Sequence, residues 1–170
     1  MLSNLALLVL SPLVSWFGDE PAGSIVRDHQ QTIMNRKKIL VVDDDAVILK
    51  SLTIKLNARG YDVMTATDGG AAVSAVRTQH PDLILLDISF PPDVGHGGGV
   101  AWDGFLIMAW IKRMEEAAHI PIVIITGGDP AKYEERARKI GATAFFHKPI
   151  DHEGLFEVIS KALGESPATT

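Results

Sequence analysis

Short apolar runs and stretches of helical periodicity alternate along most of the chain. The runs are bounded by polar residues, which is typical of strands buried on both faces of a parallel sheet. They predict strands at residues 39–42, 63–66, 83–86, 122–125 and 144–146.

The stretches between these strands repeat apolar residues at helical spacing. Ile48, Leu52 and Leu56 recur every fourth residue, and Gly60 follows where a helix would end. The other predicted helices are at 71–76 with Asp68 as its cap, from Asp103 through Ile107, Ile111 and Met114, at 131–140 ending at Gly141, and through Leu155, Ile159 and Leu163. Five strand-helix units in alternation predict an α/β fold with right-handed crossovers and a parallel sheet covered on both faces.

The helix after Asp103 is apolar around more of its circumference than a one-sided surface helix needs. We therefore expect something to cover it. The preceding loop, the N-terminal stretch and another protein are all candidates at this point.

The first 35 residues do not share this pattern. Residues 2–17 are mostly apolar, but the run is short and interrupted, which disfavours a membrane-spanning helix. The first basic residue, Arg27, follows the run, whereas a secretory signal carries positive charge ahead of it. Because Met34 immediately precedes the opening of the domain, Asn-Arg-Lys-Lys-Ile-Leu-Val-Val, we interpret 1–35 as a leader that is disordered or an overlong start. An interfacial anchor is the alternative.

Composition limits the remaining choices. The 170 residues are 46% hydrophobic and 22% charged, which predicts one folded domain at 36–164 and a short tail at 165–170. With no cysteine, thiolate metal sites and disulfides are excluded. The formal net charge of -5 argues against direct DNA binding.

Polar residues follow four of the predicted strands, and the carboxyl ends of parallel strands meet at one edge, where ligands bind in open α/β sheets. These residues are Asp43, Asp44 and Asp45 after the first strand, Asp87 after the third, Thr126 at the fourth, and Lys148 after the fifth. Each alone could be a helix cap, a turn residue or a solvated charge. Together, the carboxylates store repulsion that a cation would relieve.

Oxygen ligands of this kind suit Mg²⁺, which also retains waters and phosphate oxygens. Lys148 and Thr126 could then bind the oxygens of a phosphoryl group, whose transfer depends mainly on positioning and charge neutralisation. A carboxylate can itself be attacked to give an acyl phosphate. The pattern thus predicts phosphorylation of one Asp.

At this point the sequence resembles the receiver domain of two-component response regulators, in its single-domain, chemotaxis-regulator-like form, over residues 37–163. The resemblance is carried by Ile-Leu-Val-Val-Asp43-Asp44-Asp45, by Leu-Ile-Leu-Leu-Asp87 with Pro91 four residues on, by Ile-Ile-Thr126-Gly127, and by Gly141-Ala142-Thr-Ala-Phe145-Phe-His-Lys148-Pro149. It implies a doubly wound, flavodoxin-like (βα)5 fold with strand order 2-1-3-4-5.

The resemblance also implies roles for these residues. Asp87 would be the phosphoacceptor. Asp43, Asp44 and Asp87 would hold Mg²⁺ together with the carbonyl group of Ser89.

Thr126 and Lys148 would contact the phosphoryl group. Thr126 and Phe145 would act as the switch, with Phe145 turning inward when Thr126 moves toward the phosphoryl oxygens. A cis peptide bond would precede Pro149.

The implied donor is a phosphohistidine on a sensor histidine kinase or a histidine phosphotransfer protein. The protein would not be a conventional enzyme, since it would only accept and lose a phosphoryl group. No output domain follows the last predicted helix, so signalling would pass through a downstream protein target. The face formed by helix 131–140, strand 144–146 and the last helix would bind that target or form a homodimer. The expected location is cytoplasmic.

Two features depart from the family pattern. The loop at 91–103 is enlarged and glycine-rich, and it could be a surface insertion or a lid in which His96 or Trp102 reaches toward Asp87. Phe145 stands where a tyrosine is frequent in the family, so its switching could signal only through shape and apolar exposure.

Phosphatases of the haloacid dehalogenase type are the alternative, with Asp43 as nucleophile. Their D-x-D-x-[TV] motif is matched by the five residues that start at Asp43. Chain order argues against them, because their remaining acidic strand end follows the lysine, whereas Asp87 precedes Lys148.

Overall fold

The computed structural model describes residues 36–89 and 103–165. The chain divides into two units, Met1–Asn35 and Arg36–Thr170, and the fold below belongs to the second. The predicted leader, nearly all of the enlarged loop and the tail beyond residue 165 lie outside the described residues. None of the described helices has the length and apolar character needed to cross a membrane.

The fold class is confirmed: five parallel strands form one sheet in the order β2-β1-β3-β4-β5. The strands are β1 (Lys38–Val42), β2 (Asp62–Ala66), β3 (Leu83–Leu86), β4 (Ile122–Thr126) and β5 (Ala144–His147). The strands β1, β3 and β4 lie inside the sheet and are almost wholly buried, whereas the edge strands β2 and β5 are partly exposed. Near-continuous apolar sequence therefore marks the central strands, as expected for a sheet covered on both faces.

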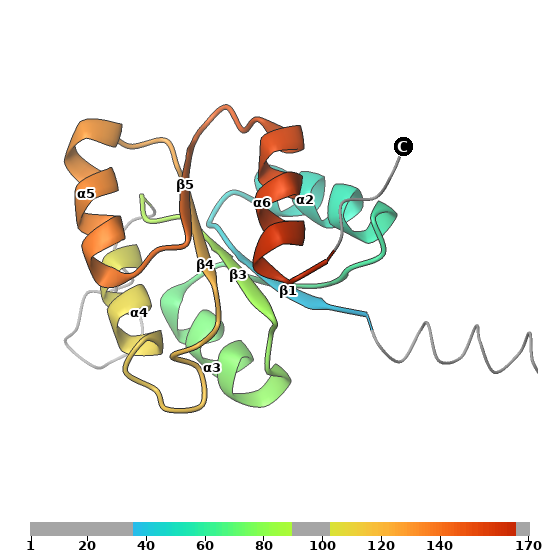
Figure 1. Cartoon of the computed structure of the whole chain (residues 1–170), viewed down its shortest axis with the longest axis horizontal. Coiled ribbons are helices and arrows are strands. Elements are labelled where there is room, and N and C mark those ends of the chain that lie inside the picture. The colour runs from blue at the N-terminus through green and yellow to red at the C-terminus, as the bar shows by residue number, and fades with distance from the viewer. Residues whose placement is uncertain (1–35, 90–102, 166–170) are drawn as a thin grey trace, which may run out of the picture. The chain divides into compact units, whose positions relative to one another are not determined.

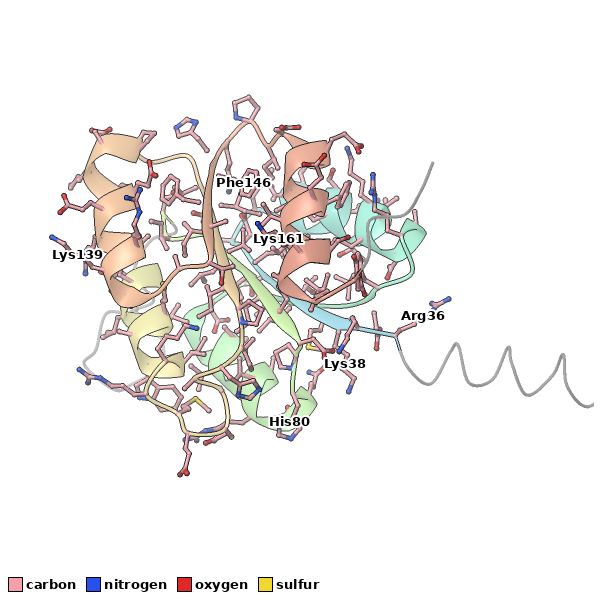
Figure 2. All side chains as sticks on the ribbon, viewed as in Figure 1. Arg36, Lys38, His80, Lys139, Phe146 and Lys161 are labelled. Carbon is pink, nitrogen blue, oxygen red and sulfur yellow. The ribbon has the colours of Figure 1, made fainter. Side chains whose placement is uncertain are left out.

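Helices cover both faces of the sheet, α2 and α6 on one side and α3, α4 and α5 on the other (Figure 1). Their bounds are α2 (Ala46–Ala58), α3 (Gly69–Gln79), α4 (Gly104–Ile111), α5 (Pro130–Ile140) and α6 (His152–Ala162). Alternate strand residues supply the two cores. In β5, Phe145 packs on the side of α5, and Phe146 packs on the side of α6, where Figure 2 labels it.

Aspartate residues are the N-caps of four of these helices. The carboxylate of each accepts a hydrogen bond from a backbone N–H in the first turn, which satisfies a donor that has no partner within the helix. These caps are Asp45, Asp68, Asp103 and Asp129. At the other end of α5, Gly141 has a φ of 96°, a conformation that glycine adopts without steric cost. The three predicted features at Asp68, Asp103 and Gly141 are confirmed.

The helix after Asp103 is shorter than predicted. It ends at Ile111, and Met114 lies in the turn beyond it, although Met114 is still buried. The backbone tightens there, because the N–H of Met114 donates to the carbonyl of Ile111, three residues back. The ammonium group of Lys112 also donates to the carbonyls of Ala118 and Ile120, which stabilises the turn.

Most of the apolar surface of α4 is covered by the domain itself. Phe105, Ile107 and Met108 are buried in the core between the sheet and the neighbouring helices. Trp110 is partly buried and lies under the guanidinium of Arg77 from α3, 4.9 Å from the ring centroid. The unusual hydrophobicity of α4 therefore reflects its position between the sheet, α3 and α5.

Candidate functional site

The register of the sheet places two buried carboxylates side by side. Val42 of β1 is the partner of Leu86 of β3, so Asp43 and Asp87, which follow them, leave the same edge of adjacent strands. The backbone N–H of Asp87 donates to the carbonyl of Val42 at 2.9 Å, which continues the ladder by one residue. Asp43 is 2% exposed and Asp87 is 3% exposed. Unpaired, two such groups would repel each other strongly.

Lys148 supplies the counter-charge. Its Nζ lies 2.7 Å from Oδ2 of Asp43 and 2.6 Å from Oδ2 of Asp87, so one ammonium group bridges both carboxylates. The backbone of Lys148 is held beside β4 by its own N–H, which donates to the carbonyl of Thr126, and the peptide bond to Pro149 is cis. The cis bond that the resemblance implied is confirmed.

The second oxygen of each carboxylate is held by the loop that follows its strand. Oδ1 of Asp43 accepts from the N–H of Asp45 at 2.9 Å. Oδ1 of Asp87 accepts from both the N–H and the hydroxyl of Ser89, each at 2.7 Å. Both side chains are therefore fixed in orientation before any ligand arrives.

The acidic residues could hold a metal ion. Asp44 is exposed, and one carboxylate oxygen each from Asp43, Asp44 and Asp87 lie within 4.8 Å of one another. A set of oxygen donors with few protein ligands fits Mg²⁺, which fills its octahedron with water and phosphate oxygens. The three predicted carboxylates are thus brought together, and their role as ligands stays a prediction, as does that of the carbonyl of Ser89.

Burial and charge shift the acidity of two of these groups. Burial raises the pKa of Asp43 above its ordinary value, and the negative charge of Asp87 adds to this, although hydrogen bonds from Lys148 and Asp45 act in the opposite direction. For Lys148, burial disfavours the ammonium form, but the two carboxylates outweigh this and raise its pKa. A cation at this site would favour the ionised form of Asp43.

Thr126 and Phe145 lie on neighbouring strands. Thr126 is fully buried at the end of β4, and its Oγ1 accepts from the N–H of Gly128 at 3.1 Å. Phe145 pairs with Ile124 in the register, two residues before the position opposite Thr126. Its ring is partly buried beside a cavity of about 250 Å³ between β5 and α5.

Two contributors to the site were not predicted from the sequence. One is the hydroxyl of Ser89, which was considered only for its carbonyl. The other is Gly104, where a Cβ would lie 2.7 Å from the carbonyl oxygen of Asp87 and closer still to the Cα of Ile88. The start of α4 thus packs closely against the backbone of Asp87 and Ile88, just after β3. The sequence feature that could have indicated this close packing is the glycine directly after the helix cap Asp103.

The fold and the site define a doubly wound parallel α/β protein with an acidic cluster and a bridging lysine at the carboxyl edge of its sheet. Residues 39–160 match the family model described as the response regulator receiver domain. The chain therefore belongs to this family, and the alternative class, the haloacid dehalogenase-type phosphatases, is set aside.

Individual relatives agree with this assignment. The chain is 32% identical over 130 residues to the polar-differentiation response regulator DivK of Brucella ovis, covering 76% of this chain and 98% of that protein. Among solved structures, it is similar to a CheY-like receiver domain protein from Methanospirillum hungatei, with a TM-score of 0.67 and 25% identity over 76% of this chain and 95% of the other. The chemotaxis response regulator CheY4 of Vibrio cholerae gives a TM-score of 0.65 and 26% identity, covering 75% and 99%. Proteins of this family are signalling proteins.

Proposed function

We propose that Asp87 accepts a phosphoryl group from a phosphohistidine on a sensor histidine kinase or a histidine phosphotransfer protein. A carboxylate oxygen of Asp87 attacks phosphorus, the bond between phosphorus and the imidazole nitrogen breaks, and the imidazole leaves with the electron pair and takes up a proton. The product is an acyl phosphate. The observation that carries the proposal is the contact of Lys148 with both Asp43 and Asp87, beside Asp44.

The residues around Asp87 each have a part in this step. Lys148 offsets part of the negative charge of the two carboxylates in the resting state and can turn to an oxygen of the incoming phosphoryl group, because its Nζ already lies beside Asp87. Thr126 can donate its hydroxyl proton to another phosphoryl oxygen while its Oγ1 still accepts from Gly128.

Asp43, Asp44 and Asp87, with the carbonyl of Ser89, would hold Mg²⁺. When bound, the ion would neutralise charge that builds up on the phosphoryl oxygens during transfer. The orientation of Asp43 and Asp87 by backbone N–H groups supports this assignment, since preorganised ligands lose little freedom on binding.

Phosphorylation would shift the domain between two states through Thr126 and Phe145. The partly buried ring of Phe145 and the cavity beside it leave room for the ring to change position. The face formed by α5, β5 and α6 would then bind a downstream protein target or a second copy of the chain. In this proposal the protein acts in the cytoplasm, and its chemistry is limited to accepting the phosphoryl group and losing it again by hydrolysis.

The test is labelling by a small donor. The protein is incubated with phosphoramidate or acetyl phosphate and Mg²⁺, and the modified residue is located by intact-mass and peptide mass spectrometry. We expect one phosphoryl group on Asp87, lost in the variant Asp87→Asn. The exposed Asp62, at the other end of the strands, gives the matched control Asp62→Asn, which should label normally. Label on Asp43, or no label at all, would refute the proposal.

A further inference from the structure

An aromatic side chain of α5 lies directly on the loop that follows Thr126. The ring of Tyr133 packs on Gly128, where a Cβ would come 2.7 Å from the Cδ2 atom of the ring and closer still to Cε2. The same Cβ would lie 3.5 Å from Oγ1 of Thr126. Because Gly128 has no side chain, the ring touches the main chain whose N–H donates to that hydroxyl.

Tyr133 also contacts α4, the helix that packs against Asp87, the proposed phosphoacceptor. The ring of Tyr133 lies 5.7 Å from the ring of Phe105 on α4, inclined at 46°, and Phe105 is buried. Its neighbour Gly104 is the residue pressed against the backbone of Asp87 and Ile88.

These contacts join the two loops of the site outside the sheet. From Asp87 the path runs through Gly104 and Phe105 to Tyr133, and from there through Gly128 to Thr126. Within the sheet the same two strands, β3 and β4, are already neighbours. Thr126 is therefore held by the sheet, and Gly128, which donates to its hydroxyl, is held by the aromatic pair of Tyr133 and Phe105.

We propose that Tyr133 is a positioning residue, which sets the place of the Thr126 hydroxyl through Gly128 and couples its movement to α4 and α5. This inference rests on the proposed function, in which Thr126 binds the phosphoryl group. A displacement of Thr126 moves Gly128 through their hydrogen bond, and close-packed neighbours do not deform freely. The movement therefore reaches the Tyr133 ring.

Two charged side chains of α5 contact the aromatic pair and would carry a movement of the rings to the surface of that helix. The guanidinium of Arg136 lies 4.0 Å from the centroid of Phe105, and the ammonium of Lys132 lies 5.2 Å from that of Tyr133. Both belong to the exposed side of α5. A change in the aromatic pair thus changes the charged surface of this helix. This coupling through Tyr133 would act in addition to the proposed switch through Phe145.

The experiment separates binding of the metal from binding of the phosphoryl analogue. Affinities are measured for Mg²⁺ alone and for beryllofluoride in saturating Mg²⁺, where the beryllofluoride group on the carboxylate stands in for the acyl phosphate. The variants are Tyr133→Leu, which removes the ring and keeps apolar bulk, and Tyr133→Phe, which keeps the ring. We expect the leucine variant to lose roughly threefold to tenfold in beryllofluoride affinity, the range of an aromatic pair energy. Its Mg²⁺ affinity should stay within about twofold, and phenylalanine should restore wild-type behaviour.

A double-mutant cycle with Phe105→Leu tests the path. We expect the loss in the double variant to be smaller than the product of the two single losses, because either change breaks the same ring contact. Thermal midpoints of all variants show whether each is folded. If a leucine variant fails to fold, Tyr133→Met takes its place, as a ring-free side chain of similar apolar bulk.

The possible failures are distinct. If the wild type binds no beryllofluoride in Mg²⁺, the proposed function falls and this inference falls with it. If the wild type binds and Tyr133→Leu binds equally well, only the inference is refuted. Equal losses of Mg²⁺ and beryllofluoride affinity would also refute it, since they would show general loosening of the site.

Discussion

Replacing Lys148 by methionine should destabilise the metal-free protein and make it more responsive to Mg²⁺. The change keeps an unbranched side chain, one atom shorter, but removes the charge that bridges Asp43 and Asp87 at 2.7 and 2.6 Å. The two carboxylates would then face each other with no ammonium group between them. Mg²⁺ would become the principal source of positive charge at the site.

The size of the effect follows from burial. Removing one partner of a buried ion pair costs about 3–5 kcal/mol. The side chain of Lys148 is 22% exposed, so water offsets part of this, and we expect a loss of about 2–3 kcal/mol. For a domain of this size, that lowers the thermal midpoint by roughly 10 °C.

Thermal unfolding followed by circular dichroism, in EDTA and in excess Mg²⁺, measures both effects. The matched control is Lys139→Met, because Lys139 points outward from α5 (Figure 2) and its side chain is 73% exposed in an ion pair with Glu135. Exposed helix pairs contribute about 0.3–0.5 kcal/mol, so this variant should unfold close to the wild type. An EDTA midpoint of Lys148→Met equal to that of the control, or a larger Mg²⁺ shift in the wild type than in Lys148→Met, would refute the reasoning.

Further expected outcomes concern pH, packing and the metal. Because the pKa of Asp43 is raised in the folded state, its contribution to stability is full below the ordinary value of 3.8 and is lost as the pH rises through the raised pKa. In EDTA, the wild type should therefore lose stability relative to Asp43→Asn over that range, and a constant difference in urea-unfolding free energies would contradict this. Gly104→Ala should cost about 1–3 kcal/mol through its clash with the backbone at Asp87, whereas Gly127→Ala, with no described atom within 4 Å of its Cβ, should cost less than about 0.5 kcal/mol in the same assay. Mg²⁺ should raise the thermal midpoint of the wild type but not that of Asp43→Asn, and equal shifts would argue against Asp43 as a ligand.

Much of the fold could be predicted because its signals are local. A strand buried on both faces needs consecutive apolar residues, so the strand predicted at 83–86 matches β3 at both ends. A helix needs a cap for its free N–H groups, so Asp68 and Asp103 could be assigned from their positions. The end of α4 was misjudged, because apolar spacing continues to Met114 after the helical hydrogen bonds have stopped.

The residues that gather at the site could be predicted from the sequence, but the hydrogen bonds and ion pairs between them could not. The pattern of the chain places Asp43, Asp87 and Lys148 at strand ends, and a parallel sheet gathers such ends at one edge. Lys148 and Asp43 are 105 positions apart in the chain, and which oxygen the ammonium meets depends on how every strand between them packs. The hydroxyl of Ser89 on Asp87 depends in the same way on the turn after β3.

By itself, the sequence determined the order of strands and helices along the chain, the buried faces of the sheet and the gathering of several carboxylates and a lysine at its carboxyl edge. These properties follow from residue type and spacing, which act within a few positions of the chain. Only the tertiary structure decided that one lysine bridges two carboxylates, that α4 must begin with glycine, and that Tyr133 rests on Gly128. Those contacts join distant segments, and they depend on the close packing of a whole interior rather than on any local pattern.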